Sequence, residues 1–387
     1  MRPVATIADL RERARRRLPR VAFDYIDGGA DGEVTLRENC RIFDDVVFRP
    51  RCGVAFADAD LKTTVLGQTI ALPIILAPVG SSRMFWPRGE AHAAAAAGKA
   101  GTIYTLSTFS GTRLEEVKAA TSGPCWYQLY LCGGRDVAIS AMARAKAAGY
   151  TALVVTIDTA VSGKRERDIH NGSKELISGH PIAMLPFAGQ LLSRPQWLCR
   201  FLLDGGLMQF PNVVLPDGPM RYADVAAQLA AAVVEWADFT WIRNAWQGPI
   251  IVKGVHTADD ARCAVDAGAA AVVVSNHGGR QLDGVAPTLR VLPEVVRAVG
   301  DRVEVLFDGG IRRGADVLKA LALGARATLI GRAYAYGLGA SGEEGVTRSL
   351  SILREDLVRT MKLLGCASIR DLDARYVDAS SLTPHSL

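Results

Sequence analysis

The chain has 387 residues, of which 49% are hydrophobic and 22% are charged. These values are ordinary for a globular protein and exclude a disordered chain, which combines low hydrophobicity with high net charge. With 45 Lys and Arg against 40 Asp and Glu, the net charge of +5 does not indicate a nucleic-acid-binding surface, and we expect no nucleic-acid partner. The length suits either several average domains or one large α/β barrel with insertions.

The cysteines argue against a disulfide framework and against a zinc site. There are seven, an odd number, and they are scattered without a Cys-x-x-Cys pair. Histidines other than His277 show no metal-ligand spacing, so we expect no metal site. The N-terminal residues lack the apolar core of a signal peptide, and together these features predict a reducing, cytoplasmic location.

The first 72 residues do not follow the pattern of the rest of the chain, and we expect them to form a helical cap over one end of it. From residue 73 onward, a short apolar run is repeatedly followed by a polar or Gly-rich turn and an Ala-rich helical stretch. The runs lack strict alternation, as is typical of strands buried on both faces. The eight runs are Pro73–Ala77, Thr102–Leu106, Cys125–Tyr130, Ala152–Ile157, Pro249–Lys253, Ala270–Ser275, Val303–Asp308 and Ala327–Gly331.

Eight strand–helix units predict a (β/α)8 TIM barrel over residues 73–364, within a single α/β domain that spans the chain. Residues 171–224, after the fourth strand, do not fit the repeat and contain six prolines and several apolar clusters. A long irregular segment is usually functional or mobile, so we predict either an ordered lid or a surface that contacts a membrane or a partner.

The last helical element has the clearest pattern. Apolar residues from Val346 to Leu364 recur at spacings of three and four, which predicts one buried stripe of a helix that ends at Gly365. Just before it, Gly337–Gly342 formally matches G-x-G-x-x-G, but it follows the last strand instead of opening a strand–helix unit. A Rossmann NAD site is therefore disfavoured.

Polar residues gather at the carboxyl ends of the predicted strands, where barrel active sites lie. They include a candidate base, His277, a carboxylate, Asp158, and a cation, Lys253. Strands seven and eight end in Asp308–Gly314 and Gly331-Arg332. Their glycines let backbone N–H groups approach an anion and their arginines add positive charge, which predicts a phosphate site.

The segment Ser275–Asp283, with the sequence SNHGGRQLD, is the most specific motif in the chain. It resembles the FMN-dependent 2-hydroxy acid oxidases and dehydrogenases, which include glycolate oxidase, L-lactate dehydrogenases and (S)-mandelate dehydrogenase. The resemblance covers nearly the whole chain, and residues 85–89 and 158–168 are most similar to the mandelate branch. Further matching stretches, in the family's order, are Phe23–Ala30, Ala77-Pro78, Trp126–Tyr130, Asp158–Glu166, Val252–Gly254 and Asp308–Gly310.

The resemblance implies an FMN enzyme that oxidises an (S)-2-hydroxy acid to the 2-oxo acid. It implies that His277 is the base and that Asp158 is the carboxylate that stabilises the imidazolium. Arg165 and Arg280 would bind the substrate carboxylate, for which a planar guanidinium is better suited than lysine.

The tyrosines and the cofactor contacts also come from the resemblance. Tyr25 and Tyr130 would hydrogen-bond the substrate carboxylate or its 2-hydroxyl. Lys253 would place positive charge where flavin reduction builds negative charge. The implied FMN-binding residues are Ala77, Pro78 and Val79 near N5, Ser107, Gln128, Thr156 and Ser275 at the polar edge, Lys253, Asp308 at the ribityl chain, and Gly309, Gly310, Arg312, Gly331 and Arg332 at the phosphate.

Three alternatives stay open for the reaction. Gly80 stands where glycolate oxidase has Ala, which favours a dehydrogenase that uses a quinone or another acceptor over an oxidase that produces hydrogen peroxide. A non-redox FMN isomerase and a phosphate-binding barrel without catalysis are the other two. The family also implies a homotetramer, and the insertion resembles the membrane-associating segment of mandelate dehydrogenase, which implies peripheral membrane contact. Phe109, Val161 and the insertion are expected to shape the substrate pocket.

Overall fold

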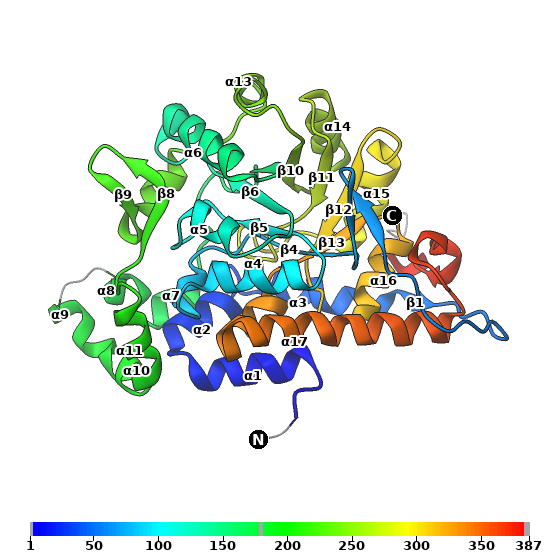
Figure 1. Cartoon of the computed structure of the whole chain (residues 1–387), viewed down its shortest axis with the longest axis horizontal. Coiled ribbons are helices and arrows are strands. Elements are labelled where there is room, and N and C mark those ends of the chain that lie inside the picture. The colour runs from blue at the N-terminus through cyan, green and yellow to red at the C-terminus, as the bar shows by residue number, and fades with distance from the viewer. Residues whose placement is uncertain (1–2, 178–180, 383–387) are drawn as a thin grey trace.

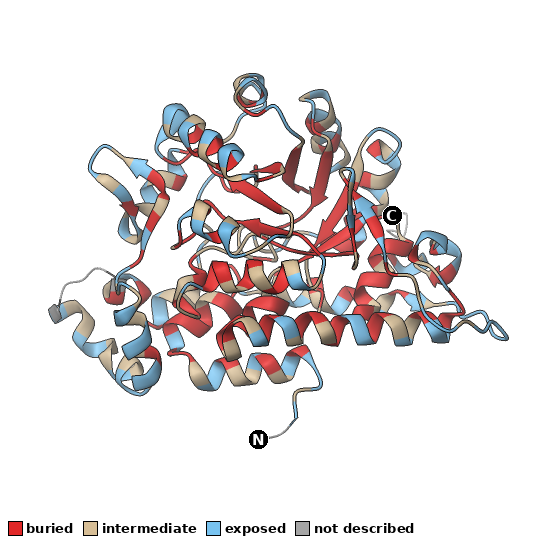
Figure 2. Cartoon of the chain, in the orientation of Figure 1, coloured by how far each residue is buried: buried red, intermediate tan, exposed pale blue. Residues whose placement is uncertain are grey.

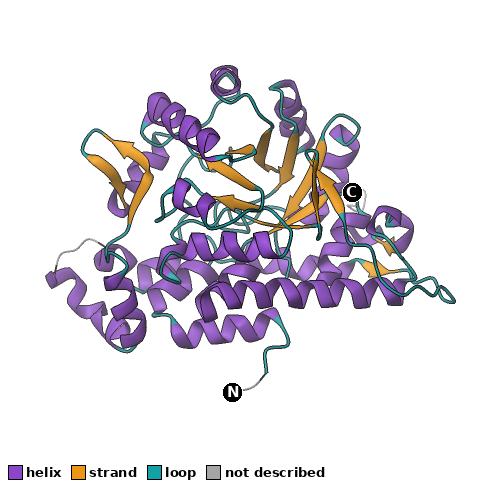
Figure 3. Cartoon of the chain, in the orientation of Figure 1, coloured by secondary structure: helices purple, strands orange, loops and turns teal. Residues whose placement is uncertain are grey.

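The structure, a computed structural model, describes residues 3–177 and 181–382, so His180 and His385 lie outside the described residues. Eight parallel strands form a closed barrel, ringed by helices (Figures 1 and 3). Seven of the predicted apolar runs contain one of these strands, and the strand of the fifth run, Pro249–Lys253, extends two residues further to Val255, which confirms the (β/α)8 barrel. In barrel order they are β4 (Ile74–Leu76), β5 (Tyr104–Leu106), β6 (Cys125–Leu129), β7 (Ala152–Thr156), β10 (Ile250–Val255), β11 (Ala271–Val274), β12 (Glu304–Asp308) and β13 (Ala327–Ile330).

The interior of the barrel is filled with apolar side chains, and Figure 2 shows the strands almost entirely buried. Trp126 and Ile251 are among these fully buried residues, so the barrel is a packed core with no pore. The outer helices cover the other face of each strand. They are α4 (Gly89–Lys99), α5 (Leu114–Ala119), α6 (Gly134–Ala148), α13 (Asp238–Ala245), α14 (Ala258–Asp266), α15 (Thr288–Val299), α16 (Gly314–Ala322) and α17 (Arg332–Leu364).

The last helix, α17, ends as predicted at Gly365, which has a φ of +65°. It begins earlier than the apolar stripe and is kinked at Ser341 and Gly342, whose backbone angles are not helical. The G-x-G-x-x-G match falls inside this kinked helix. Gly337 lies so close to the backbone of Gly345 that a side chain would not fit there, so these glycines serve helix packing.

The N-terminal segment covers both ends of the barrel, which differs from the expected cap over one end. Helices α1 (Ile7–Arg17) and α2 (Arg20–Asp27) lie beside α17 (Figure 1), and α2 and α3 (Val34–Arg41) face the loops that follow the barrel strands. The hairpin of β2 (Thr63–Val65) and β3 (Gln68–Ile70) closes the opposite end, where its apolar residues join the interior cluster. Without this hairpin the apolar interior would meet water. A short β1 (Val47–Phe48) pairs with β14 (Val377–Asp378).

A long insertion follows β7, the fourth strand of the barrel, as predicted. Its helices α9–α11 extend away from the barrel (Figure 1), and Trp197 anchors them by donating its indole N–H to the carbonyl of Met84 over 2.8 Å. The chain then returns through an antiparallel hairpin. The elements are α7 (Glu166–His170), α8 (Ser173–Ile177), α9 (Pro181–Met184), α10 (Ala188–Leu192), α11 (Pro195–Leu203), β8 (Gln209–Leu215), β9 (Gly218–Arg221) and α12 (Val225–Ala230).

Candidate active site

A cavity of about 1290 Å³, including its open mouth, lies at the carboxyl ends of the barrel strands. Most residues predicted for the site line it, although they come from distant parts of the sequence. Asp158, Gln128 and Ser275 do not line it, but each hydrogen-bonds a residue that does, and Thr156 bonds Gln128. The predicted residues that line the cavity are Tyr25, Ala77, Pro78, Val79, Ser107, Tyr130, Arg165, Lys253, His277, Arg280, Asp308, Gly309, Gly310, Arg312, Gly331 and Arg332.

His277 and Asp158 form a hydrogen-bonded pair. His277 Nδ1 lies 2.8 Å from Asp158 Oδ1, and because an ionised carboxylate only accepts, Nδ1 carries the proton. Burial opposes ionisation of Asp158, but the His277 charge and hydrogen bond, with the charge of Lys253, hold the pKa of this carboxyl below its usual value. His277 Nε2 is left facing the Tyr130 hydroxyl at 3.4 Å. The imidazole is therefore arranged to accept a proton at Nε2.

The loop after β11 gives His277 its position through unusual backbone angles. His277 has a φ of +57°, and Gly278 and Gly279 follow it at +65° and +73°. Glycine adopts this left-handed region freely, whereas a histidine does so only when its surroundings hold it there. The backbone N–H of His277 donates to Ser275 Oγ over 3.1 Å, which is one such restraint.

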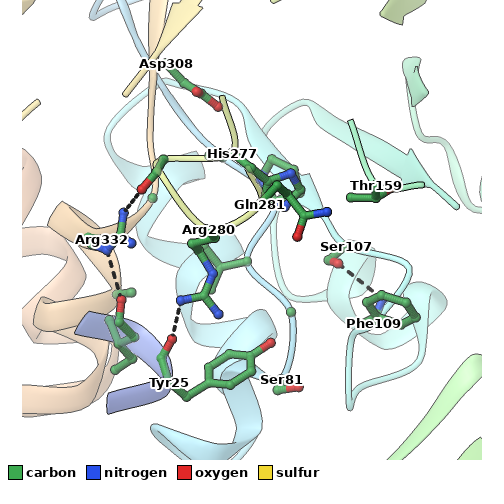
Figure 4. Close-up of a pocket in the computed structure, with 18 of the residues that line it drawn as sticks. Tyr25, Ser81, Ser107, Phe109, Thr159, His277, Arg280, Gln281, Asp308 and Arg332 are labelled. Carbon is green, nitrogen blue, oxygen red and sulfur yellow. Dashed lines mark hydrogen bonds between the residues drawn. The ribbon is translucent and has the colours of Figure 1, made fainter. Parts of the chain in front are cut away.

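Two arginines and a tyrosine form a cationic wall of the cavity. The Arg280 side chain runs from the His277 loop to the cap, where it donates to the carbonyls of Tyr25 and Gly28 at 2.7 and 3.0 Å (Figure 4). Its guanidinium lies 5.0 Å from the Tyr25 ring centre, and that of Arg165 lies 5.9 Å from it. Burial and the nearby Arg165 charge lower the pKa of Arg280. Asp168 pairs with Arg165 at 2.7 Å, so this pair of cations is only partly neutralised and attracts an anion.

A buried lysine lies at the end of β10. Lys253 Nζ is 3.1 Å from Asp308 Oδ2 and donates to Ser275 Oγ over 2.9 Å. Burial favours the neutral amine, but the charges of Asp308 and Asp158 outweigh it and raise the pKa of Lys253. The amine is therefore a fixed positive charge beside the cavity. Asp308 Oδ1 is buried and has no partner among the described residues.

The loops after β12 and β13 contribute glycines and two further arginines. Gly309 and Gly310 have φ values of +116° and +78°, backbone angles that glycine adopts freely and that other residues rarely adopt. Arg332 donates to the carbonyls of Gly278 and Ile26 (Figure 4) and to that of Gly28, and burial lowers its pKa to about 10. Arg312 donates a guanidinium N–H to the carbonyl of Ile311. These hydrogen bonds pair neither guanidinium with a carboxylate, so the two positive charges fit an anion site.

A row of aromatic rings also lines the cavity. Tyr130 stacks on Phe109 with ring centres 5.0 Å apart, Phe109 lies 5.5 Å from Phe210, and Phe210 lies 5.9 Å from Tyr222. Of these, Tyr130 and Phe109 were expected, whereas Phe210 and Tyr222 were missed because they belong to the insertion. The Asp217-Gly218 turn between apolar runs is a hairpin signal for β8, which carries Phe210, and β9, which ends one residue before Tyr222. Burial raises the pKa of Tyr222.

Gln281 is a further residue of the site whose role was not predicted from the sequence. Its side-chain amide donates to the carbonyls of Asp158 and Val161 at 3.1 and 2.9 Å, and its oxygen accepts the backbone N–H of Gly163 at 3.1 Å. It thus ties the loop after β7 to the His277 loop. Val161, expected in the pocket wall, is 64% exposed and does not line the cavity. Among the described residues, no group of three or more potential ligands is arranged to hold a metal.

Comparison with known proteins decides the family. Residues 14–379 match the model of the FMN-dependent dehydrogenases. The chain belongs to this family. It is 45% identical over 378 residues to an L-lactate dehydrogenase of Caulobacter vibrioides, with 96% of each chain covered. It is 42% identical over 373 residues to an L-lactate dehydrogenase of Stenotrophomonas maltophilia, covering 95% of this chain and 97% of that one.

Solved structures of this FMN-dependent dehydrogenase fold agree with the comparison of sequences. The monotopic membrane protein (S)-mandelate dehydrogenase superposes with a TM-score of 0.90 at 36% identity, covering 98% of this chain and all of that one. A mandelate oxidase superposes with a TM-score of 0.81 at 37% identity, covering 97% and 98%. Both carry the same barrel over nearly their whole length.

The cavity fits FMN, the cofactor of this family. The unpartnered oxygen of Asp308 is an acceptor for a polyol hydroxyl, and the charge of Lys253 suits the end of a flavin that becomes negative on reduction. The loop after β12 brings Gly309, Gly310 and the Arg312 guanidinium to the cavity, and a turn of left-handed glycines beside a cation suits an anion. A flavin, a polyol and a phosphate therefore each meet the chemistry that they need.

Proposed function

We propose that the protein uses FMN to oxidise a small (S)-2-hydroxy acid to the 2-oxo acid, with His277 as the base. One observation carries this proposal: the pair of His277 and Asp158 shares a single cavity with Arg165 and Arg280. A base beside two arginines suits a substrate that carries a carboxylate next to the carbon that is oxidised. A phosphate-binding barrel without catalysis leaves this arrangement unexplained, and a non-redox isomerase has no need of the paired arginines.

Substrate binding would begin with the carboxylate. Arg280 and Arg165 would hold it by charge and hydrogen bonds, and the Tyr25 hydroxyl would add another bond. Because Arg280 follows His277 by three residues in one loop, a carboxylate on Arg280 would bring the 2-carbon and its hydroxyl to the imidazole. The two guanidiniums would also replace water around the carboxylate.

The proton would move to His277 Nε2. Asp158 holds Nδ1–H, which presents Nε2 as the acceptor, and its negative charge would stabilise the imidazolium as it forms. Tyr130, whose hydroxyl lies 3.4 Å from Nε2, would orient the substrate hydroxyl. FMN, when bound, would accept the two electrons and the second of the two protons that the substrate loses.

The residues that would hold FMN line the same cavity as Arg165 and Arg280 or are linked by hydrogen bonds to residues that do. The backbone of Ala77–Val79 would lie against the reacting part of the flavin, and Lys253 would provide positive charge at its pyrimidine end. The linked side chains of Ser107, Gln128 and Thr156 support the same edge. The remaining contacts would be Ser275 near Lys253, Asp308 with the ribityl hydroxyls, and Gly309, Gly310, Arg312, Gly331 and Arg332 with the phosphate.

An anaerobic bleaching experiment tests this function. The purified protein should be yellow and should lose its flavin absorbance when an (S)-2-hydroxy acid is added without oxygen. The (R) enantiomer and the methyl ester, which lacks the carboxylate charge, should leave the colour unchanged. A colourless protein, or a yellow one that no 2-hydroxy acid bleaches, would reject the proposal.

The electron acceptor is proposed to be a quinone or a similar carrier. Gly80 lines the cavity, and an added Cβ there would lie 3.1 Å from Phe109 Cβ and 3.4 Å from the Tyr25 hydroxyl. The glycine thus lets Phe109 and the Tyr25 hydroxyl pack closely beside the proposed flavin position. Turnover with a soluble quinone should exceed turnover with oxygen, whereas stoichiometric peroxide at full rate in air would favour an oxidase.

The similar proteins include both lactate and mandelate enzymes, so the size of the substrate side chain has to be inferred from the residues that line the cavity. The aromatic row of Phe109, Phe210 and Tyr222 favours an acid with an apolar or aromatic side chain. Ranking lactate, mandelate and longer 2-hydroxy acids by the rate of flavin bleaching decides this point.

We also propose that the insertion makes peripheral membrane contact, which the monotopic mandelate dehydrogenase supports. Among the described residues, no helix combines the length and the apolarity that a membrane crossing requires. The insertion instead exposes an apolar surface on α9–α11, where side chains are between 61% and 88% exposed. This apolar surface consists of Ile182, Leu185, Leu192, Leu202 and Leu203.

Replacing Leu202 and Leu203 by serine should release the protein from sedimenting lipid vesicles. Leu363→Ser, on α17, removes a side chain that is 71% exposed outside the insertion and is the matched control. Equal sedimentation of all three proteins would reject the membrane contact. A homotetramer, which the family resemblance implies, is tested by light scattering on the same samples.

A further inference from the structure

Two buried asparagines join the N-terminal cap to the His277 loop. Asn39, in α3, donates its side-chain amide to Asn276 Oδ1 over 2.8 Å, and Asn276 returns a bond to Asn39 Oδ1 over 2.9 Å. Both side chains are buried, and 237 residues separate them in the sequence. A reciprocal amide pair of this kind fixes the distance and the orientation of the two segments that it joins.

The pair extends to both neighbouring loops. Asn276 Oδ1 also accepts the backbone N–H of Gly279 at 3.2 Å, so this bond links the residues on either side of His277 and Gly278. Asn39 Oδ1 also accepts the backbone N–H of Thr288 at 3.2 Å, and the Thr288 hydroxyl donates to the carbonyl of Asp308 at 2.7 Å. The backbone of Asn39 lies so close to Gly310 that no side chain would fit between them.

His277 needs this support because its φ of +57° is a sparsely populated conformation for a residue with a side chain. Such a conformation persists only when surrounding contacts hold it. Asn276 precedes His277 directly, and its side chain is held by the reciprocal bonds with Asn39 and by a further bond to the carbonyl of Ala286 at 3.3 Å. Neither asparagine lines the cavity, so neither is placed to touch substrate or FMN.

We propose that Asn39 is a positioning residue: from the cap, it holds the His277 loop in the left-handed conformation that directs the imidazole toward Asp158. This inference rests on the proposed role of His277 as the base. It explains in physical terms why α3 covers this end of the barrel. The cap is then part of the catalytic arrangement and does more than close the barrel.

Two substitutions at Asn39 test the proposal. Asn39→Ala removes every side-chain bond of the residue, whereas Asn39→Asp keeps both accepted bonds and loses only the donated one. Asn212→Ala is the matched control, because Asn212 is also buried and bonds Leu114 and Thr112 through its side chain. Thermal unfolding of all three variants measures what each lost amide costs in stability.

Asn39→Ala should lower the rate of flavin reduction at least tenfold, with FMN retained and the substrate dissociation constant changed less than threefold. Asn212→Ala should keep the native rate even where its melting temperature falls as far. For Asn39→Asp, the rate relative to the native protein should rise as the pH falls, because a protonated carboxyl can donate to Asn276 Oδ1. A native rate in Asn39→Ala would overturn the proposal.

A second readout does not depend on turnover. In protein labelled with ¹⁵N-histidine, the His277 ring, assigned from the His277→Asn variant, should show one tautomer with the proton on Nδ1. Asn39→Ala should average the two tautomers, and Asn212→Ala should not. An unchanged His277 signal in Asn39→Ala would refute the inference even if the native protein bleaches with no 2-hydroxy acid, an outcome that would reject the proposed function separately.

Discussion

The hydrogen bond between His277 and Asp158 leads to a prediction with a definite size. Asp158 Oδ1 accepts from His277 Nδ1 at 2.8 Å, and Asp158 Oδ2 has no partner among the described residues, so the carboxylate charge is directed at the imidazole. The pKa of Asp158 lies below its usual value, so the carboxylate stays ionised at neutral pH. Asp158→Asn keeps an acceptor of the same shape and removes the charge.

The magnitude follows from the charge that develops on His277. Two unit charges 4 Å apart interact by about 4 kcal/mol at an effective dielectric constant of 20. Since about 1.4 kcal/mol corresponds to tenfold in rate, losing all of it would slow proton transfer by about 10³-fold. The asparagine oxygen retains part of the interaction, so we expect a reduction of about 10²- to 10³-fold.

Stopped-flow measurement of flavin reduction without oxygen is the appropriate assay, because it separates the chemical step from reoxidation. Asp158→Asn should lower the limiting rate while the substrate concentration for half-saturation changes less than threefold. Asp168→Asn is the contrasting variant: Asp168 pairs with Arg165, so its loss should alter substrate affinity more than the limiting rate. If Asp158→Asn reduces flavin within threefold of the native rate, the electrostatic reasoning is wrong.

Two further predictions concern stability. Lys253→Met leaves the buried carboxylate of Asp308 without its ion pair, so it should lower the free energy of unfolding by about 3–5 kcal/mol. Urea titrations of the FMN-loaded protein measure this loss. The double variant Lys253→Met with Asp308→Asn should recover part of the lost stability, and no recovery would contradict the pairing. Asp27 is buried, which opposes its ionisation, but hydrogen bonds from Arg11, Tyr336 and Arg167 lower its pKa to about 2. A carboxyl whose pKa is lower in the folded protein than in the unfolded chain, where it is near 4, stabilises the fold above pH 4, and this contribution is lost as the pH falls toward 2. The free energy of unfolding of the native protein should therefore fall by about 2 kcal/mol over this range, and that of Asp27→Asn should fall less. Parallel acid-unfolding curves for the two proteins would count against this contribution of Asp27.

Repeated local patterns made the barrel predictable from the sequence. A strand buried on both faces needs a continuous apolar run, and each of the eight runs coincides with a strand apart from differences of one or two residues at the ends. Gly365 could be expected to end α17 because glycine alone adopts the left-handed angles there without cost. The β2–β3 hairpin was not placed, since which end of a barrel a flanking segment covers depends on tertiary packing and not on local periodicity.

The candidate site divides in the same way. His277 and Arg280 follow β11 and Lys253 lies in the carboxyl-terminal half of β10, and residues at the carboxyl ends of parallel barrel strands meet at one end. Tyr222 and Asn39 lie outside the strand–helix repeat, and nothing local in the sequence shows that they reach the cavity or its loops. Helical residues such as Asn39 gain their role from a contact made more than two hundred residues away.

One measurement tests the central claim most directly: reduction of bound flavin by the best 2-hydroxy acid in the His277→Asn variant, without oxygen. Asparagine keeps a polar side chain in the loop but cannot take up the proton at neutral pH. The protein should stay yellow, with native FMN content, and its flavin should be reduced at least about 10³-fold more slowly than in the native protein. Reduction at a near-native rate would contradict the assignment of His277 as the base.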